Sequence, residues 1–237
     1  MNKDTKFSRL QTIIGKEALD LLARSHVAIF GLGGVGSYAV EALARSGIGA
    51  ISVVDGDIYT VSNINRQLSA THATIGKPKV DIVAQRILDI NPECKVSKYN
   101  LFYTTETSDR FDFTQYDYIV DAIDSVSCKI ELIKRAQAEN IPIISCMGAG
   151  NRLQASAFMA DDIYNTKVCP LAKTMRKLCA QNGIEKLKVI YSKEQPIKSG
   201  NANERTVGSA AFVTGVAGLM LAGEVIKELI GYKDVGL

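Results

Sequence analysis

Glycines that follow an apolar segment near the start of the chain have the spacing of a phosphate-binding loop. Gly31, Gly33, Gly34 and Gly36 come directly after residues 26–30, in the pattern Gly-x-Gly-Gly-x-Gly. Where a strand turns into a helix, the missing side chains let phosphates approach the backbone, and the helix N-terminus supplies N–H donors. The pattern predicts nucleotide binding but leaves NAD, FAD, S-adenosylmethionine and ATP open.

A polar cluster after the next apolar segment narrows this choice. Asp55 ends that segment, where its carboxylate would accept hydrogen bonds from ribose hydroxyls. The other polar residues of the cluster are Asp57, Asn63, Asn65, Arg66, Gln67 and Lys79. A guanidinium fork and a lysine charge suit phosphate oxygens, and neutral amides suit a polyphosphate or a nucleoside. Because hydride transfer needs none of these groups, the cluster favours ATP, with Arg66 and Lys79 stabilising charge at the attacked phosphate.

Two carboxylates follow a later apolar segment. Asp121 and Asp124 lie in the run Asp-Ala-Ile-Asp, at the carboxyl end of a predicted strand, where sheets of this type bind ligands. Mg²⁺ takes one or two carboxylates together with substrate oxygens. We predict that Asp124 binds Mg²⁺ beside the ATP phosphates, and that Asp121 is a hydrogen-bonded residue at the strand end.

The elements that position these residues alternate between strand and helix in the first 150 residues. The predicted strands are 26–30, 51–54, 95–99, 118–122 and 141–146, and the predicted helices are 34–46, 76–90 and 127–139. This alternation is typical of an α/β, Rossmann-like fold, with a mostly parallel central sheet and helices on both faces.

The pattern changes after residue 150. Residues 153–159 and 187–191 alternate like half-exposed antiparallel strands, and they flank a basic amphipathic helix at 170–180. A loop follows at 195–206 and a closing helix at 209–230. We therefore expect the parallel sheet to be extended by antiparallel C-terminal strands.

Positive charge is concentrated between Lys167 and Lys198. This segment holds eight Lys or Arg residues against two Glu, although the net charge of the whole chain is only +3. Such a density can hold a nucleic-acid backbone by displacing counterions, and the alternative is an ordinary solvated face. On the predicted helix, Lys173, Arg176 and Lys177 are the candidate contacts to RNA.

Cysteine usage and hydropathy exclude several classes of protein. The five cysteines form no C-x-x-C pair, which argues against a disulfide framework and a four-cysteine zinc site, and favours a reducing cytoplasm. Cys169 has two possible roles, an acyl-accepting thiol or a structural thiol, and we favour the structural role. The uncharged residues 207–223 number 17, which is short for a membrane span and indicates a buried helix.

In their order, these motifs resemble those of the ubiquitin-activating-enzyme-like superfamily, which includes the molybdopterin and thiamine adenylyltransferases. The resemblance implies a single adenylation domain over residues 1–237, with a nucleotide-binding part (1–150) and an extension for substrate binding and dimerisation (151–237). It also implies ATP, Mg²⁺ and an acyl-adenylate intermediate. The superfamily places an N-terminal arginine on the ATP of the neighbouring subunit, so Arg9 is the matching candidate and a homodimer is expected.

Within the superfamily, the chain lacks the two C-x-x-C zinc pairs that sulfur-carrier adenylyltransferases usually have. The runs Cys169-Pro-Leu-Ala-Lys173 and Tyr191-Ser-Lys-Glu194 look like the tRNA threonylcarbamoyladenosine dehydratase family. That resemblance implies ATP-dependent dehydration, by ring closure, of a modified adenosine beside the tRNA anticodon. It leaves open a sulfur-transfer partner protein and a monovalent cation near residues 148–150.

Two other functions stay open from the sequence. One is an adenylyltransferase that activates the C-terminus of a ubiquitin-like sulfur-carrier protein for molybdopterin or thiamine biosynthesis. It keeps the same ATP residues and differs in the partner. The other is a nucleotide-binding redox or regulatory module that does no adenylation.

Overall fold

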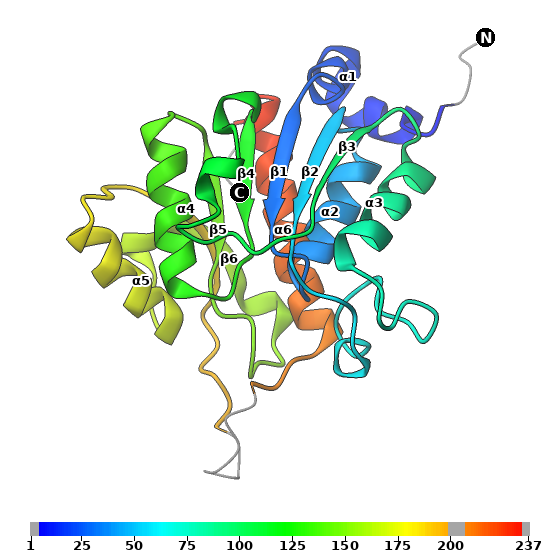
Figure 1. The fold of residues 1–237 in the computed structure, drawn as a ribbon. Helices are drawn as coiled ribbons and strands as arrows, with labels where there is room; N and C mark the ends of the chain where they lie inside the picture. The colour runs from blue at the N-terminus through cyan, green and yellow to red at the C-terminus, as the bar shows by residue number, and fades with distance from the viewer. Residues whose placement is uncertain (1–4, 199–206, 234–237) are drawn as a thin grey trace.

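A single seven-stranded sheet organises the computed structural model, which describes residues 5–198 and 207–233 (Figure 1). The strands are β1 (His26–Phe30), β2 (Ala50–Val54), β3 (Lys95–Tyr99), β4 (Tyr118–Asp121), β5 (Ile143–Cys146), β6 (Phe158–Asp162) and β7 (Lys188–Ser192). Their order across the sheet is β3-β2-β1-β4-β5-β7-β6. All neighbours are parallel except β6 and β7, which are antiparallel.

Helices cover both faces of this sheet, as Figure 1 shows. They are α1 (Ser8–Leu22), α2 (Gly36–Arg45), α3 (Lys79–Ile90), α4 (Val126–Ala138), α5 (Pro170–Gln181) and α6 (Ala211–Leu229). Short 3₁₀ helices are η1 (Val61–Asn63), η2 (Ser108–Arg110), η3 (Phe113–Gln115), η4 (Ala155–Ala157) and η5 (Ile163–Asn165). Helices α2, α3 and α6 pack on one face, and α4 and α5 on the other.

The central strands are apolar along their whole length because both of their faces are covered. In β1, Val27 and Ile29 belong to the core under α2 and α6, whereas Ala28 and Phe30 belong to the core under α4. Parallel pairing of such strands requires crossover helices, and these bring the carboxyl ends of β1, β2 and β4 to one edge. The strand order reverses between β1 and β4, so this edge contains the switch point at which ligands bind in sheets of this type.

The predicted fold class is confirmed, with corrections to individual elements. Helix α3 begins at Lys79 instead of residue 76, because residues 76–78 form the approach to it. The strand predicted at 153–159 is wrong in position, since residues 155–157 form η4 and β6 starts at Phe158. Strand β7 is parallel to β5, so β6 alone among the described strands runs against the others.

Two further segments concern the start of the chain and the region before α6. Helix α1, which the sequence analysis did not predict, is interrupted at Gly15, where the backbone leaves the helical conformation. Of the loop predicted at 195–206, residues 195–198 have no regular structure and residues 199–206 lie outside the described residues. In the part of the chain that the structure describes, no helix is long and apolar enough to cross a membrane.

Candidate active site

A cavity of about 850 Å³ opens at the carboxyl edge of β1, β2 and β4. Its walls come from the loops that follow these strands, from the turn after β5 and from the start of α6. The volume lies within the range of small-molecule and cofactor sites. Most of the predicted site residues line this cavity: Gly31, Gly33, Gly34, Asp55, Asp57, Asn63, Arg66, Gln67, Lys79 and Asp124.

The glycine loop makes two contacts that a side chain would prevent. Gly31 has φ +93°, and a Cβ there would lie 2.6 Å from the carbonyl oxygen of Ala122. A Cβ on Gly36 would lie 1.8 Å from the carbonyl oxygen of Gly31. These approaches bring the N-cap of α2, at Val35, to the cavity, and the N-terminal end of a helix favours an anion.

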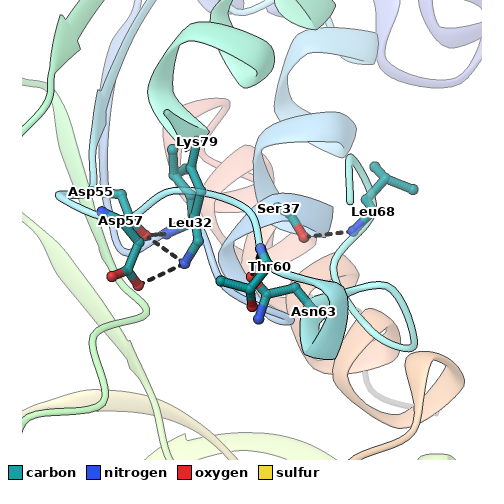
Figure 2. Close-up of polar contacts among 8 residues, drawn as sticks. All are labelled: Leu32, Ser37, Asp55, Asp57, Thr60, Asn63, Leu68 and Lys79. Carbon is teal, nitrogen blue, oxygen red and sulfur yellow. Dashed lines mark hydrogen bonds and ion pairs between the residues drawn. The ribbon is translucent and has the colours of Figure 1, made fainter. Parts of the chain in front are cut away.

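Lys79 is held in the cavity wall by two carboxylates, as Figure 2 shows. Its Nζ lies 2.9 Å from Asp57 Oδ2 and 3.7 Å from Asp55 Oδ2. Lys79 is 4% exposed and Asp55 8%, so this cation and its partner are almost withdrawn from water. Asp55 also accepts a hydrogen bond from the backbone N–H of Leu32 at 2.7 Å, which joins the second strand to the glycine loop.

Of the four polar residues in the 63–67 segment, three line the cavity and one does not. Asn63 caps η1, with its Oδ1 accepting from the N–H of Thr60 at 3.1 Å (Figure 2). Arg66 lines the cavity, and its Nη1 donates to the carbonyl of Ser62 at 2.5 Å. Gln67 is 5% exposed, and its Oε1 has no hydrogen-bond partner among the described residues. A buried acceptor of this kind is costly unless a ligand or water satisfies it.

Asn65 is the exception. It is exposed, it is absent from the cavity lining, and its Nδ2 donates to the carbonyl of Ser209 at 3.0 Å. The residue predicted as a nucleotide contact therefore bridges two cavity walls in this structure.

The two carboxylates after β4 have opposite environments. Asp121 is fully buried, and its Oδ2 accepts from Ser145 Oγ at 2.6 Å and from Lys129 Nζ at 3.0 Å. The prediction of a hydrogen-bonded strand-end residue is confirmed. Asp124 is exposed on the cavity wall, and within residues 5–198 and 207–233 no side chain pairs with it.

Lys129 was missed by the sequence analysis. It lies in an apolar helical stripe with no motif around it, and its partners are separated from it by 8 and 16 positions. A charged residue on the buried side of a predicted helix was the one available signal.

A metal site of three or more His, Cys, Asp or Glu side chains is absent from the described residues. Mg²⁺ needs fewer protein ligands than this when phosphate oxygens and water complete its shell. A single unpaired carboxylate beside a cavity that could hold phosphates, as at Asp124, fits that donor set.

Arg9 lies on the exposed side of α1 and does not line the cavity of its own chain. In Figure 1, α1 is at the top of the molecule beside the end of α6, whereas the long loop after β2 extends from the bottom. The expected action of Arg9 on the ATP of a neighbouring subunit stays a prediction.

The three basic residues predicted on α5 differ in their contacts. Lys173 and Lys177 are exposed. Arg176 is half-buried, and its Nη1 donates to the carbonyl of Thr166 at 2.7 Å and to its Oγ1 at 2.6 Å. Arg176 thus fixes the segment before α5, and this contact gives it a structural role.

The cysteines near the cavity are suited to packing. Cys128 and Cys146 line the cavity, and burial raises the pKa of Cys146 to about 12, so its thiol keeps its proton near neutral pH. Cys169 is buried at the N-cap of α5, outside the cavity lining. Both observations agree with the structural reading of these thiols.

The remaining wall contains residues that no motif indicated. Its members are mostly apolar or small: Phe102, Tyr103, Thr104, Met147, Leu171, Val207 and Thr214. The turn at 148–150 also lines the cavity, so the predicted polar residues and this largely apolar wall enclose one space.

A model of the ThiF family matches residues 7–237. A tRNA threonylcarbamoyladenosine dehydratase of Bacillus subtilis is 44% identical over 245 residues, which cover 97% of this chain and 96% of that protein. A solved E. coli tRNA N6-threonylcarbamoyladenosine dehydratase in complex with ATP superposes with a TM-score of 0.89 at 33% identity, covering 95% of this chain and 94% of that one. The molybdopterin-synthase adenylyltransferase of E. coli is 28% identical over 220 residues, covering 92% of this chain and 77% of that protein.

Proposed function

Because the chain belongs to the ThiF family, we propose that its cavity is the active site of an ATP-dependent tRNA threonylcarbamoyladenosine dehydratase. The observation that carries the proposal is the convergence of Asp55, Lys79, Arg66 and Asp124 on one cavity at the switch point of the sheet. The similarity to the tRNA threonylcarbamoyladenosine dehydratase of Bacillus subtilis extends over nearly the whole of both chains, which supports the same reaction.

The reaction closes a ring with loss of water. A carboxylate oxygen of the modified adenosine attacks the α-phosphorus of ATP, the bond to the β-phosphate oxygen breaks, and pyrophosphate leaves. An amide nitrogen of the same modification then attacks the carbonyl carbon, loses its proton, and displaces AMP. Because this second step is intramolecular, it needs no catalytic thiol.

Each side chain has a role that its surroundings support. The glycine loop and the N-terminus of α2 bind phosphates, and Asp55 accepts hydrogen bonds from the ribose. Lys79 and Arg66 stabilise the charge that develops at the α-phosphate, and Asp57 holds Lys79 in place. Asn63 and Gln67 bind the nucleotide, and the Oε1 of Gln67 is available because no described residue donates to it.

Mg²⁺ would be held by Asp124, whose carboxylate lies on the cavity wall and pairs with no side chain in the described part of the chain. The ion would neutralise phosphate charge when bound. Asp121 is not available to it because Lys129 and Ser145 occupy its Oδ2. A monovalent cation at the turn of residues 148–150 stays a prediction.

Several further assignments belong to the same proposal. The chain acts as one adenylation domain and as a homodimer in which Arg9 reaches the ATP of the other subunit. The tRNA anticodon region lies against α5 through Lys173 and Lys177, with the 151–237 part as the substrate-binding extension. The enzyme acts in the cytoplasm, and a sulfur-transfer protein is a partner to test.

The adenylyltransferase for a sulfur-carrier protein is the alternative that uses the same nucleotide residues. The chain is 28% identical to a molybdopterin-synthase adenylyltransferase and 44% identical to a tRNA dehydratase, so sequence identity favours the dehydratase. The absence of C-x-x-C pairs from the sequence also disfavours it.

The test is turnover by the purified chain with ATP, Mg²⁺ and an anticodon stem-loop that carries the linear modification. We expect pyrophosphate release and, by mass spectrometry of the nucleosides, loss of one water from the modified adenosine. The same stem-loop without the modification is the control. Adenylation of a carrier protein with no turnover of RNA would reject the proposal, and binding of NAD in preference to ATP would reject nucleotide activation altogether.

A further inference from the structure

A buried lysine lies directly beneath the cavity, outside the set of residues that line it. Lys129 is 1% exposed, and its partners Asp121 and Ser145 are fully buried. The Nζ donates to Asp121 Oδ2 at 3.0 Å, to Ser145 Oγ at 3.2 Å and to the carbonyl of Cys146 at 2.9 Å. These contacts use all three donors of the ammonium group and join α4 to β4 and β5.

Stability alone is a poor explanation for this cluster. Withdrawing two charges from water costs as much as their attraction returns, and apolar residues of similar volume often replace such pairs without loss. The neighbouring core is apolar, so the fold offers a simpler way to fill the space. A buried pair directly below a candidate active site therefore calls for a functional explanation.

The second oxygen of Asp121 supplies that explanation. Its Oδ1 accepts a hydrogen bond from the backbone N–H of Ile123 at 3.1 Å, which holds the turn after β4. Lys129 and Ser145 both bind Oδ2, so they set the plane of the carboxylate and with it the direction offered to Ile123. Asp124, the next residue, projects onto the cavity wall.

We propose that Lys129 is a positioning residue that, through Asp121, holds the turn after β4 and thereby aims Asp124 at the ATP-bound metal ion. The inference rests on the proposed function for the role of Asp124. In this scheme Lys129 touches neither the nucleotide nor the metal. It orients the metal ligand indirectly, as the hydrogen-bond partners of metal ligands commonly do.

The test measures ATP binding by calorimetry, with and without Mg²⁺, for Lys129→Met. We expect binding in the presence of Mg²⁺ to weaken by about tenfold, within the range seen when such supporting partners are lost, while binding without Mg²⁺ changes less than about twofold. Lys134→Met is the matched control, because Lys134 is exposed on the same helix. Equal weakening with and without Mg²⁺ would overturn the inference.

Ser145→Ala provides a second variant that keeps both charges and removes one hydrogen bond to Asp121. It should lose Mg²⁺-dependent affinity in the same direction and by a smaller factor. If Lys129→Met does not fold, Ser145→Ala takes its place in every comparison.

A double-mutant cycle with Asp124→Asn separates positioning from a general loss of structure. If Lys129 acts through Asp124, Lys129→Met causes no further loss of Mg²⁺-dependent affinity in the Asp124→Asn background. Additive losses would reject the inference and leave the proposed function intact. If Asp124→Asn by itself leaves Mg²⁺-dependent binding unchanged, both the metal role of Asp124 and this inference fail.

Discussion

The side-chain amide of Asn65 donates a hydrogen bond to the backbone carbonyl of Ser209, at 3.0 Å across 144 positions of sequence. The Oδ1 of Asn65 accepts from Arg66 Nη1 at 3.1 Å. Asn65 thus links the segment that precedes α6 to the guanidinium proposed to bind phosphate. Gln67, two positions further on, has the opposite arrangement: it is buried in the cavity wall, and its Oε1 accepts no hydrogen bond from the residues that the structure describes.

This contrast predicts different effects of two alanine substitutions on ATP affinity. Gln67→Ala should weaken ATP binding by about 0.5–1.5 kcal/mol, the usual net value of one hydrogen bond. Asn65→Ala should leave the Kd for ATP close to that of the wild type and reduce turnover with RNA, because Arg66 and Ser209 lose their link. Calorimetry and pyrophosphate release check the two parts, and a larger loss of ATP affinity in Asn65→Ala would return this residue to the nucleotide site.

Lys79→Ala should act on the chemical step. Phosphate charge develops in the transition state, so kcat falls by about a hundredfold while the KM for ATP changes much less. Steady-state pyrophosphate release measures both constants. Lys77→Ala is the control, since Lys77 is exposed two positions away. Full turnover in Lys79→Ala would remove Lys79 from the proposed mechanism.

Basic residues on α5 should separate into RNA contacts and a structural group. The association constant for tRNA should fall less steeply with salt when Lys173 and Lys177 are both replaced by alanine. We expect the magnitude of the slope of log K against log salt to decrease by about 1.5. Arg176→Ala should keep that slope and lower the free energy of unfolding by about 1.5–3 kcal/mol, because the hydrogen bonds to Thr166 are lost. Filter binding at several salt concentrations and chemical denaturation test this, and an unchanged slope in the double variant would take α5 off the RNA surface.

Alkaline pH should destabilise the fold. Burial raises the pKa of Cys146 to about 12, of Cys94 and Cys179 to about 11, and of Tyr59 to about 12. Above the ordinary thiol value of 9.0, the unfolded chain releases protons that the folded chain keeps, so stability falls as pH rises, by about 1.4 kcal/mol per pH unit for each titrating group. Below that pH these groups contribute no change.

Thermal unfolding between pH 7 and 11 checks this alkaline behaviour. Cys146→Ala should show a shallower loss of Tm above pH 9 than the wild type, because one titrating thiol is gone. An equal slope in both proteins would mean that Cys146 titrates alike in the folded and unfolded chains.

The pair of Lys129 and Asp121 should couple strongly in stability. Lys129→Met leaves a fully buried carboxylate without its cation, which costs about 3–5 kcal/mol of unfolding free energy. Adding Asp121→Asn removes the unpaired charge and should recover a large part of that loss. Urea denaturation of the wild type, both single variants and the double variant gives the coupling, and additive effects would argue against a direct ion pair.

Local patterns were enough to predict the strands from residue 26 to residue 146, and most of the predicted site residues do line the cavity. Asp55, Lys79 and Asp124 each lie where an apolar segment ends, and parallel strands bring such ends together. The position of β6 was not predictable in this way, because residues 155–157 alternate like a strand yet form a 3₁₀ helix.

Contacts between distant segments explain the other differences. Asn65 is a neutral amide in the polar cluster, so its sequence position suggested a nucleotide contact. It donates instead to the carbonyl of Ser209, a partner so distant in sequence that no local pattern indicates it. Lys129 has partners on two strands, so its spacing alone carries no motif. The proposed RNA substrate depends on resemblance to a family, since charge patterning left a solvated face as an alternative.

The contact of Gly31 with Ala122 has a consequence for how such a site can change over time. The carbonyl of Ala122 occupies the space that a Cβ on Gly31 would need, and two residues further on the same turn presents Asp124. The glycine loop, proposed to bind the phosphates, and the turn that contains Asp124 therefore pack backbone against backbone at Gly31 and Ala122. A change of backbone path in one of these two segments would disturb the other. We therefore expect substitutions in the glycine loop and in the turn after β4 to occur together, both in evolution and in protein design.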